Sequence, residues 1–384
     1  MIVVAEPQCT GLEHVEVNAA LLVAVRLAFP DEELLFLAED AHGGLVREKA
    51  AGRLGGGVVW QPLAVPPRNL SDARRLPAEL HCCRQVFRHA AARRARAILF
   101  CSVTSPGMYA IGLNLAVTPG PTAYLVLHNQ LETVEERPSP VPWRFPFRVG
   151  LPLRLARTAR FRPLVFGDFI RDALTARGIG GVQAIEHPYL FREPPPWQRQ
   201  PGATVRFATF GFGHASKGTD RLFALAAEIG AAAPGAAEFY HIGAMADPTL
   251  AERGGVIVPS PAAPLAREEY DRYADLMDYA LFFYPPGMYR YSASGALLDA
   301  LSHGKPIIAL RNPFFSHCFG KMGDIGYLCD SYGDLRDRVA AVVGEFPQEH
   351  YRRQRQNILD GRVIFSPAGV AGQLQAVMGE GGGR

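Results

Sequence analysis

Short apolar segments alternate with amphipathic helical segments along most of this chain. Residues 1–5 have the pattern of a buried strand, residues 14–28 that of a helix, and residues 33–38 that of a second strand. This order favours a parallel sheet with helices on both faces, because each crossover lays a helix against the sheet. We therefore expect an α/β fold.

The alternation runs through two stretches that a proline-rich segment separates. In the first stretch, further strands are expected at 57–60, 97–100, 122–128 and 163–167, and helices at 73–94, 108–116 and 170–177. In the second, strands are expected at 205–210, 238–242, 256–258, 280–284, 306–310 and 326–329. Its helices are expected at 219–229, 267–278, 294–302 and 348–378, the last with a break near Ser366. Each stretch predicts a doubly wound, Rossmann-like domain.

A length of 384 residues exceeds the size at which one core stops growing, so two domains are expected. We assign residues 1–187 to the first domain, 188–203 to a linker and 204–350 to the second domain. Residues 351–384 are expected to form helices that cross back to the first domain. Sheets of this kind bind ligands at the carboxyl ends of their strands, which predicts a central cleft.

Composition narrows the class of protein. The chain is 48% apolar and 20% charged, and its net charge of +3 is too small to indicate nucleic-acid binding. Its six cysteines show no zinc-binding spacing, and no apolar run reaches the roughly 18 residues of a bilayer crossing. No basic leader precedes the first strand. These features predict a cytoplasmic protein with reduced thiols.

The segment 291–306, YSASGALLDALSHGKP, predicts a small-residue turn that opens a helix. Ser292, Ser294 and Gly295 lie at the helix start, where backbone N–H groups without intrahelical partners bind anions such as a diphosphate. Asp299 follows on the same helix, within reach of a ribose. Together these residues indicate a nucleotide site.

The first strand of the second stretch ends in FGFGHASKGTD. Gly211 and Gly213 permit a tight turn, and Lys217 precedes an expected helix, so a lysine and a helix N-terminus converge on a phosphate position. The spacing matches neither a P-loop nor a dinucleotide fingerprint. The alternative is an ordinary strand-to-helix turn with an exposed lysine.

Together the two segments resemble the nucleotide-binding half of GT-B glycosyltransferases, particularly those of family 4, over residues 205–343. The stretch ASGALLDALSHGKPIIA is similar to that family's carboxylate helix. The resemblance implies that Asp299 binds the ribose of a sugar nucleotide and that Lys217 neutralises its phosphates. The implied donor-binding set is Gly211, Gly213, His214, Lys217, Val258, Tyr291, Ser292, Ser294, Gly295 and Asp299.

The amino half resembles the family in architecture, which implies a GT-B fold of two Rossmann-like domains that face a central cleft. His128 resembles the strand-end histidine near the transferred sugar, and the turn from Gly11 to His14 resembles the loop that closes on donor and acceptor. The implied catalytic residues are therefore His128, Glu13 and His14. His14 could equally open a helix at the surface, and we interpret His187, at the hinge, as structural.

Two positions depart from the family's pattern. Tyr291 stands where the first glutamate of the carboxylate helix is expected, and no arginine lies between Gly211 and Lys217, where His214 is the nearest basic residue. These departures favour either a divergent subgroup or an inactive relative.

The chain contains no Asp-x-Asp sequence, with which nucleotide-sugar enzymes of the other common architecture hold a metal. The resemblance therefore implies transfer without a metal or another cofactor. Fixed donors at Lys217 and at the helix start would stabilise the leaving diphosphate. It also implies retention of configuration at the transferred sugar. The acceptor would be a glycan, a lipid-linked molecule or a small molecule of bacterial-type glycan assembly.

The segment 143–162, from Trp143 to Arg162, contains six arginines and several large apolar residues but no acid. On a helix it would present a basic, aromatic-edged face to an anionic membrane surface or to an acidic lipid-linked acceptor. The other interpretation is a solvated helix whose arginine stems cover the domain.

The predicted function is transfer of a sugar from a nucleotide-diphosphate sugar to an unidentified acceptor. A sugar-nucleotide epimerase of the same fold is one alternative, and it would act without an acceptor. A non-catalytic GT-B protein that binds a glycan or a partner is another, which Tyr291 motivates. The spread of the arginines, without a recognition motif, argues against a nucleic-acid partner.

Overall fold

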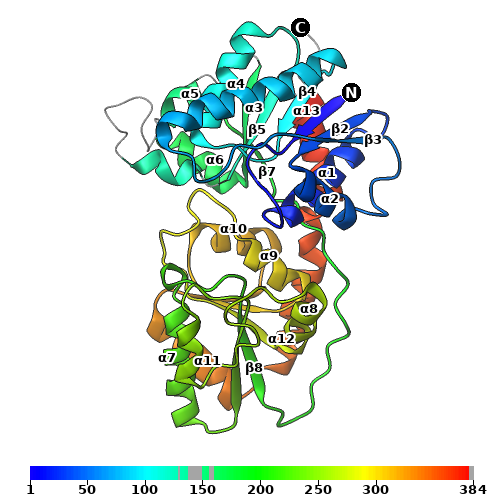
Figure 1. The fold of residues 1–384 in the computed structure, drawn as a ribbon. Coiled ribbons are helices and arrows are strands. Elements are labelled where there is room, and N and C mark those ends of the chain that lie inside the picture. The colour runs from blue at the N-terminus through cyan, green and yellow to red at the C-terminus, as the bar shows by residue number, and fades with distance from the viewer. Residues whose placement is uncertain (129, 137–148, 155–159, 380–384) are drawn as a thin grey trace. The chain divides into compact units, whose positions relative to one another are not determined.

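The computed structural model describes residues 1–128, 130–136, 149–154 and 160–379 (Figure 1). The chain divides into two compact units. Unit 1 contains Met1–Leu190, Tyr291–Ala293 and the chain from Ile364 onward. Unit 2 contains Phe191–Arg290 and Ser294–Val363. Each unit is built on its own parallel sheet.

Unit 1 contains a seven-stranded parallel sheet with the order β3-β2-β1-β4-β5-β6-β7. The strands are β1 (Ile2–Ala5), β2 (Leu34–Ala38), β3 (Val58–Pro62), β4 (Ala97–Phe100), β5 (Thr122–Leu127), β6 (Phe161–Phe166) and β7 (Gln183–Ile185). The strand order reverses between β1 and β4. In open α/β sheets, ligands bind beyond the carboxyl ends of the strands at such a reversal.

Helices cover both faces of this sheet, which explains why β1 is a fully buried apolar run. The helices are α1 (Val15–Ala28), α2 (Asp40–Lys49), α3 (Asp72–Ala92), α4 (Ser105–Val117), α5 (Gly150–Arg154), α6 (Asp168–Thr175) and α13 (Pro367–Gly379), with the 3-10 helix η1 (Gln130–Glu135). One core contains side chains of α1, α2 and α13, and the other contains side chains of α3 to α6. The red helix α13 packs against α1 within unit 1 (Figure 1).

Unit 2 contains a five-stranded parallel sheet with the order β12-β11-β10-β8-β9. The strands are β8 (Val205–Phe210), β9 (Ala237–Ile242), β10 (Tyr279–Phe282), β11 (Ile307–Leu310) and β12 (Gly326–Cys329). The helices are α7 (Thr219–Ala232), α8 (Arg267–Leu276), α9 (Gly295–Ser302), α10 (Pro313–Met322), α11 (Tyr332–Gly344) and α12 (Gln348–Gly361). Short 3-10 helices lie at η3 (Ala215–Lys217) and η4 (Pro248–Arg253), and η5 (Arg362–Phe365) spans the point at which the chain returns to unit 1. The strand order reverses between β8 and β10, so the rule for ligands points to the loops after these two strands.

Most predicted elements agree with the structure, with a few informative differences. The predicted strand at 256–258 is wrong: Ile257 forms only a single bridge, to Tyr240. Helices α2 and α10 and the three-residue strand β7 were not predicted. Helix α2 contains two adjacent glycines, and its cap is Glu39, whose carboxylate accepts from the N–H groups of Ala41 and His42. A helix with low intrinsic propensity and an uncommon cap gives a weak sequence signal.

The arginine-rich segment 143–162 is described only in part. Residues 143–148 and 155–159 lie outside the described residues, and with them three of the six arginines of the proposed basic face. The described parts form α5 and the start of β6, which places Arg162 on a strand and not on a helix. Among the described helices, none has both the length and the hydropathy that a membrane crossing requires.

Candidate functional site

The loop that follows β8 carries most of the predicted donor-binding residues of unit 2. Gly211 leaves the strand with φ +80°, a conformation that favours glycine. A side chain at Gly213 would meet the ring of His241 at 2.8 Å. One at Gly218 would meet Phe283 Cβ at 2.7 Å. These glycines therefore serve close packing as well as the turn.

Lys217 ends the 3-10 helix η3, directly before the N-cap residue that precedes the start of α7 at Thr219, and its side chain folds back over the loop. Its Nζ donates a hydrogen bond to the carbonyl of Phe212 over 3.3 Å. Burial lowers the pKa of Lys217 from its usual value. His214 caps η3, because its Nδ1 accepts a hydrogen bond from the N–H of Ser216 over 3.1 Å. The ammonium of Lys217 and the N-terminus of α7 are thus neighbours at the end of β8.

The N-terminus of α9 lies beside the end of β8. A side chain at Gly211 would lie 3.5 Å from Ala296 Cβ, in the first turn of α9. Ser294 caps this helix, since its hydroxyl accepts from the N–H of Leu297 over 3.4 Å. Gly295 adds no bulk there. The N–H groups of a first helical turn have no intrahelical acceptor, so this corner of unit 2 can receive an anion.

Asp299 lies on α9, one turn beyond this corner. Its carboxylate accepts a hydrogen bond from Tyr270 Oη over 3.2 Å and forms an ion pair with Arg267 over 3.4 Å. Both partners come from α8. Arg267 also places its guanidinium over the Tyr270 ring, at 5.2 Å from the ring centroid. The structure therefore gives Asp299 a basic and aromatic neighbourhood that the sequence did not predict.

His241, at the end of β9, is a residue that the sequence analysis missed. Its Nδ1 pairs with Thr209 Oγ1 over 2.8 Å, and its ring lies against Gly213. Burial lowers the pKa of His241 to about 4, so the ring is neutral at neutral pH. The signal that identified His128, a histidine at the carboxyl end of a strand, would have identified His241 too.

In unit 1, a buried carboxylate holds the loop that follows β1. Glu6 is fully buried, and its Oε1 accepts from the N–H of Gln8 at 2.9 Å, from the N–H of Cys9 at 3.0 Å and from Ser102 Oγ. Its Oε2 accepts from Asn18 Nδ2 at 2.8 Å. Ser102 follows β4, so this carboxylate occupies the point where the strand order of unit 1 reverses.

A second set of contacts continues from Glu6 to the turn that carries Glu13 and His14. Asn18 Nδ2 lies 2.9 Å from His42 Nε2, and His42 Nδ1 lies 2.9 Å from the carbonyl of Gly11. Because Asn18 Nδ2 is a donor, His42 Nε2 is the acceptor and His42 Nδ1 donates to Gly11. The chain Glu6–Asn18–His42 therefore fixes the position of Gly11.

Three histidines of unit 1 lie together beyond the sheet. The ring centroids of His14 and His128 are 5.2 Å apart, and those of His128 and His187 are 6.1 Å apart. Phe166 packs against both His128 and His187, each at 4.5 Å. The structure thus brings the two predicted catalytic histidines together and adds His187.

Burial determines the protonation of these three rings. It holds the pKa of His128 well below its usual value and lowers that of His187 to about 4. It also lowers the pKa of His14, against the opposing effect of the Glu6 charge. Neutral imidazoles can exchange hydrogen bonds with sugar hydroxyls but carry no charge.

Comparison with solved structures identifies the architecture. HepE of Anabaena in complex with UDP and glucose superposes with a TM-score of 0.66 at 13% identity, over 99% of this chain and 100% of that one. WaaG, a glycosyltransferase involved in lipopolysaccharide biosynthesis, gives 0.62 at 11% identity, over 99% of this chain and 100% of that one. The chain has the GT-B fold.

A third GT-B structure, TarM of S. aureus, gives a TM-score of 0.55 at 12% identity over 78% of this chain. The match covers 58% of TarM, so this chain spans little more than half the length of that protein. No protein-family model matches the sequence, and no curated protein matches it either. At sequence identities of 11–13%, these structural similarities show a shared fold and no more.

The remaining predicted donor residues, Val258, Tyr291 and Ser292, are divided between the two units. Val258 is half-buried beside the single bridge that Ile257 makes. Tyr291 and Ser292 belong to unit 1 by their contacts, whereas Ser294 and Gly295 belong to unit 2. Tyr291 is 4% exposed, and its hydroxyl donates to Glu135 Oε1 over 2.9 Å. The structure therefore groups Gly211, Gly213, His214, Lys217, Ser294, Gly295 and Asp299 in unit 2 without Tyr291 and Ser292.

Glu13 completes the predicted catalytic set of the amino-terminal GT-B unit. It is half-buried and forms an ion pair with Arg68. His14 follows it in a left-handed backbone conformation, φ +57°, as the first residue before α1. Glu13 and His14 are thus part of the loop that the Glu6 network holds.

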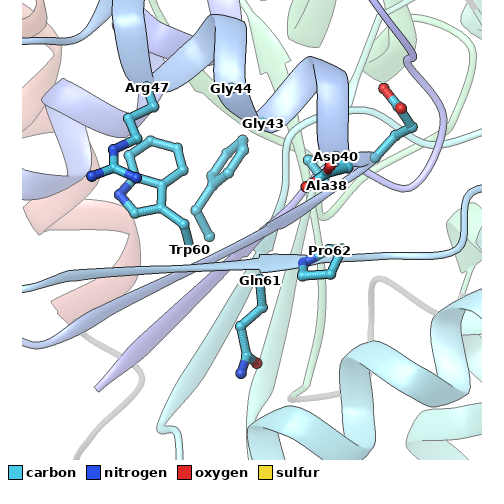
Figure 2. Close-up of a pocket in the computed structure, with 10 residues that line it drawn as sticks. Ala38, Asp40, Gly43, Gly44, Arg47, Trp60, Gln61 and Pro62 are labelled. Atoms are coloured by element: carbon cyan, nitrogen blue, oxygen red, sulfur yellow. The ribbon is translucent and has the colours of Figure 1, made fainter.

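Unit 1 also contains a small pocket at the carboxyl ends of β2 and β3. Figure 2 shows Trp60 and Arg47 on one side of it and Asp40 on the other. The Trp60 ring packs against Phe36 at 5.1 Å, and Glu39 at the rim is engaged in capping α2. The pocket holds about 140 Å³. Because small-molecule sites usually hold roughly 300–1,000 Å³, it is too small for a nucleotide sugar.

Proposed function

We propose that this chain is a glycosyltransferase that moves a sugar from a nucleotide-diphosphate sugar to an unidentified acceptor. The observation that carries the proposal is the approach of the β8 loop to the first turn of α9, at Gly211 and Ala296. This approach brings the N–H groups of α9 and the loop that carries Lys217 together at the strand-order reversal of unit 2. Open α/β sheets bind ligands at such a reversal.

Each donor-binding residue has a proposed role in this reaction. Lys217 and the first turn of α9 hold the diphosphate and stabilise the charge that develops when the glycosidic bond breaks. Asp299 accepts hydrogen bonds from the ribose hydroxyls, beside the Tyr270 hydroxyl and the Arg267 guanidinium that also contact its carboxylate. We further propose that transfer needs no metal and retains configuration, as in the family that the sequence resembles.

Unit 1 supplies the acceptor side of the proposed reaction. His128 and His14 are neutral and adjacent, so they can orient a sugar or acceptor hydroxyl through hydrogen bonds. Glu13 is the nearby carboxylate that can take a proton from the acceptor. A glycan, a lipid-linked acceptor or a small molecule would satisfy this arrangement. We also propose a cytoplasmic location, with peripheral membrane contact through the segment 143–162 if the acceptor is lipid-linked.

The relatives of known structure supply the first ligand to test. HepE has been solved with UDP and with UDP-glucose, and TarM has been solved with UDP. We therefore propose UDP-glucose as the first donor and UDP as the first ligand for binding measurements. Adenosine, guanosine and thymidine diphosphates complete the panel, since the base contacts are unassigned.

Calorimetric titration with UDP tests the proposal. Lys217→Ala removes a charged hydrogen bond to the diphosphate, worth about 1.5–3 kcal/mol, so affinity is expected to fall at least about tenfold. Asp299→Asn is expected to weaken binding as well, because the ribose loses a carboxylate acceptor. Lys321→Ala is the matched control, an exposed lysine on α10 of the same unit. Unchanged affinity in both test variants, or no binding of any diphosphate in the panel, would contradict the proposal.

A non-catalytic binding protein is the second candidate, and Tyr291 favours it. A buried tyrosine bound to Glu135 replaces the acid that the resemblance expects at this position. Under this alternative the chain binds a glycan or a partner and does not cleave a nucleotide sugar. Release of UDP from UDP-glucose, with or without an added acceptor, separates the two functions.

A further inference from the structure

The loop after β1 brings three different metal-ligating side chains together in unit 1. Cys9 Sγ, a carboxylate oxygen of Glu13 and a ring nitrogen of His14 all lie within 4.8 Å of one another. Cys9 is fully buried, whereas Glu13 and His14 are half-buried. The three residues do not match a familiar zinc spacing, which is why the sequence predicted no metal there. The fold creates the cluster by turning the loop back on itself before α1.

A second observation also points to a missing ligand. His14 Nδ1 is inaccessible to solvent and has no hydrogen-bond partner among the described residues. Buried side-chain nitrogens are almost always satisfied, so an unsatisfied one needs an explanation. Capping does not provide it, because the His14 side chain makes no cap hydrogen bond at the start of α1. A bound cation would satisfy this nitrogen.

The types of ligand select a class of metal. Thiolate and imidazole ligands favour Zn²⁺ and related transition metals over Mg²⁺ and Ca²⁺, which prefer oxygen. In a tetrahedral zinc site, bond lengths of about 2.0–2.3 Å place the ligand atoms roughly 3.3–3.8 Å apart. The observed limit of 4.8 Å therefore needs a closure of at most about 1.5 Å, which side-chain rotation can supply. The ion pair with Arg68 is made through Glu13 Oε2, and a carboxylate has a second oxygen that can bind a metal.

The backbone of this loop is held in place before any metal binds. Glu6 accepts from the N–H of Cys9, and His42 donates to the carbonyl of Gly11, so the loop is anchored on both sides of residue 10. Groups that orient the ligands contribute strongly to the affinity of a metal site. Cys9 Sγ also lies 3.7 Å from Ser102 Oγ, a weak contact that a metal can replace.

We propose that Cys9, Glu13 and His14 bind one Zn²⁺, with a fourth position open to water or to another ligand. The Cys9 thiol loses its proton when the metal binds. Three protein ligands and one open position are the arrangement of a zinc site that exchanges ligands. Zinc at this position occupies Glu13 and His14, so it inhibits sugar transfer. This last consequence rests on the proposed function, whereas the metal site itself does not.

Metal titration of the chelator-treated full chain tests the site without any sugar donor. Zn²⁺ is titrated in competition with a chromophoric chelator, and Co²⁺ is added separately as a spectroscopic substitute. We expect one equivalent to bind and Co²⁺ to give the near-ultraviolet charge-transfer band of a cobalt–thiolate bond. Cys9→Ser is expected to abolish the band, and His14→Gln to weaken Zn²⁺ binding at least about tenfold.

Two further variants keep the test decisive. Cys82→Ser is the matched control, since Cys82 is an equally buried thiol on α3 outside the cluster, and it is expected to bind Zn²⁺ as the parent chain does. Glu13→Gln changes a half-buried position, so weakened binding in this variant cannot result from loss of the core. The proposal is overturned if the parent chain shows no saturable site, if Co²⁺ gives no thiolate band, or if Cys9→Ser retains the band. UDP binding is measured separately, and its failure would contradict the proposed function but not the metal site.

Discussion

Replacement of Glu6 by glutamine tests the buried network of unit 1 with the smallest change of shape. The carboxylate accepts from three donors through Oε1, namely the N–H groups of Gln8 and Cys9 and the hydroxyl of Ser102. It accepts from Asn18 alone through Oε2. A glutamine will keep its oxygen toward the three donors and will therefore turn its NH₂ group toward the NH₂ group of Asn18.

The loss of stability depends on which orientation the Asn18 side-chain amide adopts in the variant. If Asn18 keeps its orientation, the chain loses one hydrogen bond to a charged group and places two donors face to face, which costs about 1.5–3 kcal/mol. If Asn18 flips, its oxygen accepts from the new glutamine, but His42 must then donate from Nε2. Its Nδ1 can no longer donate to the carbonyl of Gly11, and that bond contributes about 0.5–1.5 kcal/mol. Because the variant adopts the less costly arrangement, we expect unit 1 to lose about 0.5–1.5 kcal/mol.

Native-state hydrogen exchange measures this loss in unit 1 alone. A chain of two units need not unfold in one step, so a single global free energy would mix them. The measured quantity is the opening free energy of the β1 amides, together with that of the Gln8 and Cys9 amides. Glu48→Gln provides the control, because it makes the same chemical change at an exposed position of α2. A loss of less than about 0.5 kcal/mol for Glu6→Gln, relative to that control, would refute the hydrogen-bond assignment.

Three further changes test other parts of the structure. Gly218→Ala is expected to destabilise unit 2 by about 2–4 kcal/mol, because φ is +73° and the new Cβ meets Phe283. Gly235→Ala has a similar φ of +75° but open space, so an equal loss in urea unfolding would contradict the clash. Burial lowers the pKa of Lys305 to about 7. Above that pH the unfolded chain binds more protons than the folded chain does, because only the unfolded lysine stays protonated. The free energy of unfolding should therefore rise by about 1.4 kcal/mol per pH unit toward pH 10. Lys305→Met should remove that slope, and identical slopes in the two proteins would refute the assignment. Tyr291→Phe should lower the stability of unit 1 by about 1.5–3 kcal/mol, because the hydrogen bond to Glu135 is lost, and should leave UDP affinity unchanged. A large loss of UDP affinity would instead assign Tyr291 to the donor site.

The fold could be predicted because its periodic signals are local. The buried run of β1 and the alternation after Val205 report the parallel sheets directly, and the structure confirms both. Helix α2 escaped prediction because Gly43 and Gly44 weaken its pattern, and tertiary packing of Val46 supplies what propensity does not. Strand β7 has only three residues, too few to show a period.

Candidate site residues could be named from the sequence only where a single residue beside a predicted strand or helix was enough to indicate a site. His128 ends a predicted strand and Lys217 precedes a predicted helix, so a local signal marks each of these candidates. The Glu6–Asn18–His42 chain does not, because it joins three elements whose pairing depends on the strand order. The partners of Asp299 on α8 likewise depend on how two helices pack. Such contacts arise from the tertiary fold, and no spacing in the sequence records them.

The packing of α13 against α1 has a consequence for how the chain is made. Val370, Leu374 and Met378 of α13 are almost fully buried in the core that α1 and β1 share, although more than 300 residues of chain separate them from α1. Ribosomes deliver the amino terminus first, and domains usually fold as they emerge. Here the apolar face of unit 1 that α13 covers stays exposed until unit 2 has been synthesised in full. The first part of the protein to leave the ribosome is therefore the last to complete its core. A chaperone that covers the apolar face of α1 during synthesis would bind a partly folded state of unit 1 that lasts longer than any such state of unit 2.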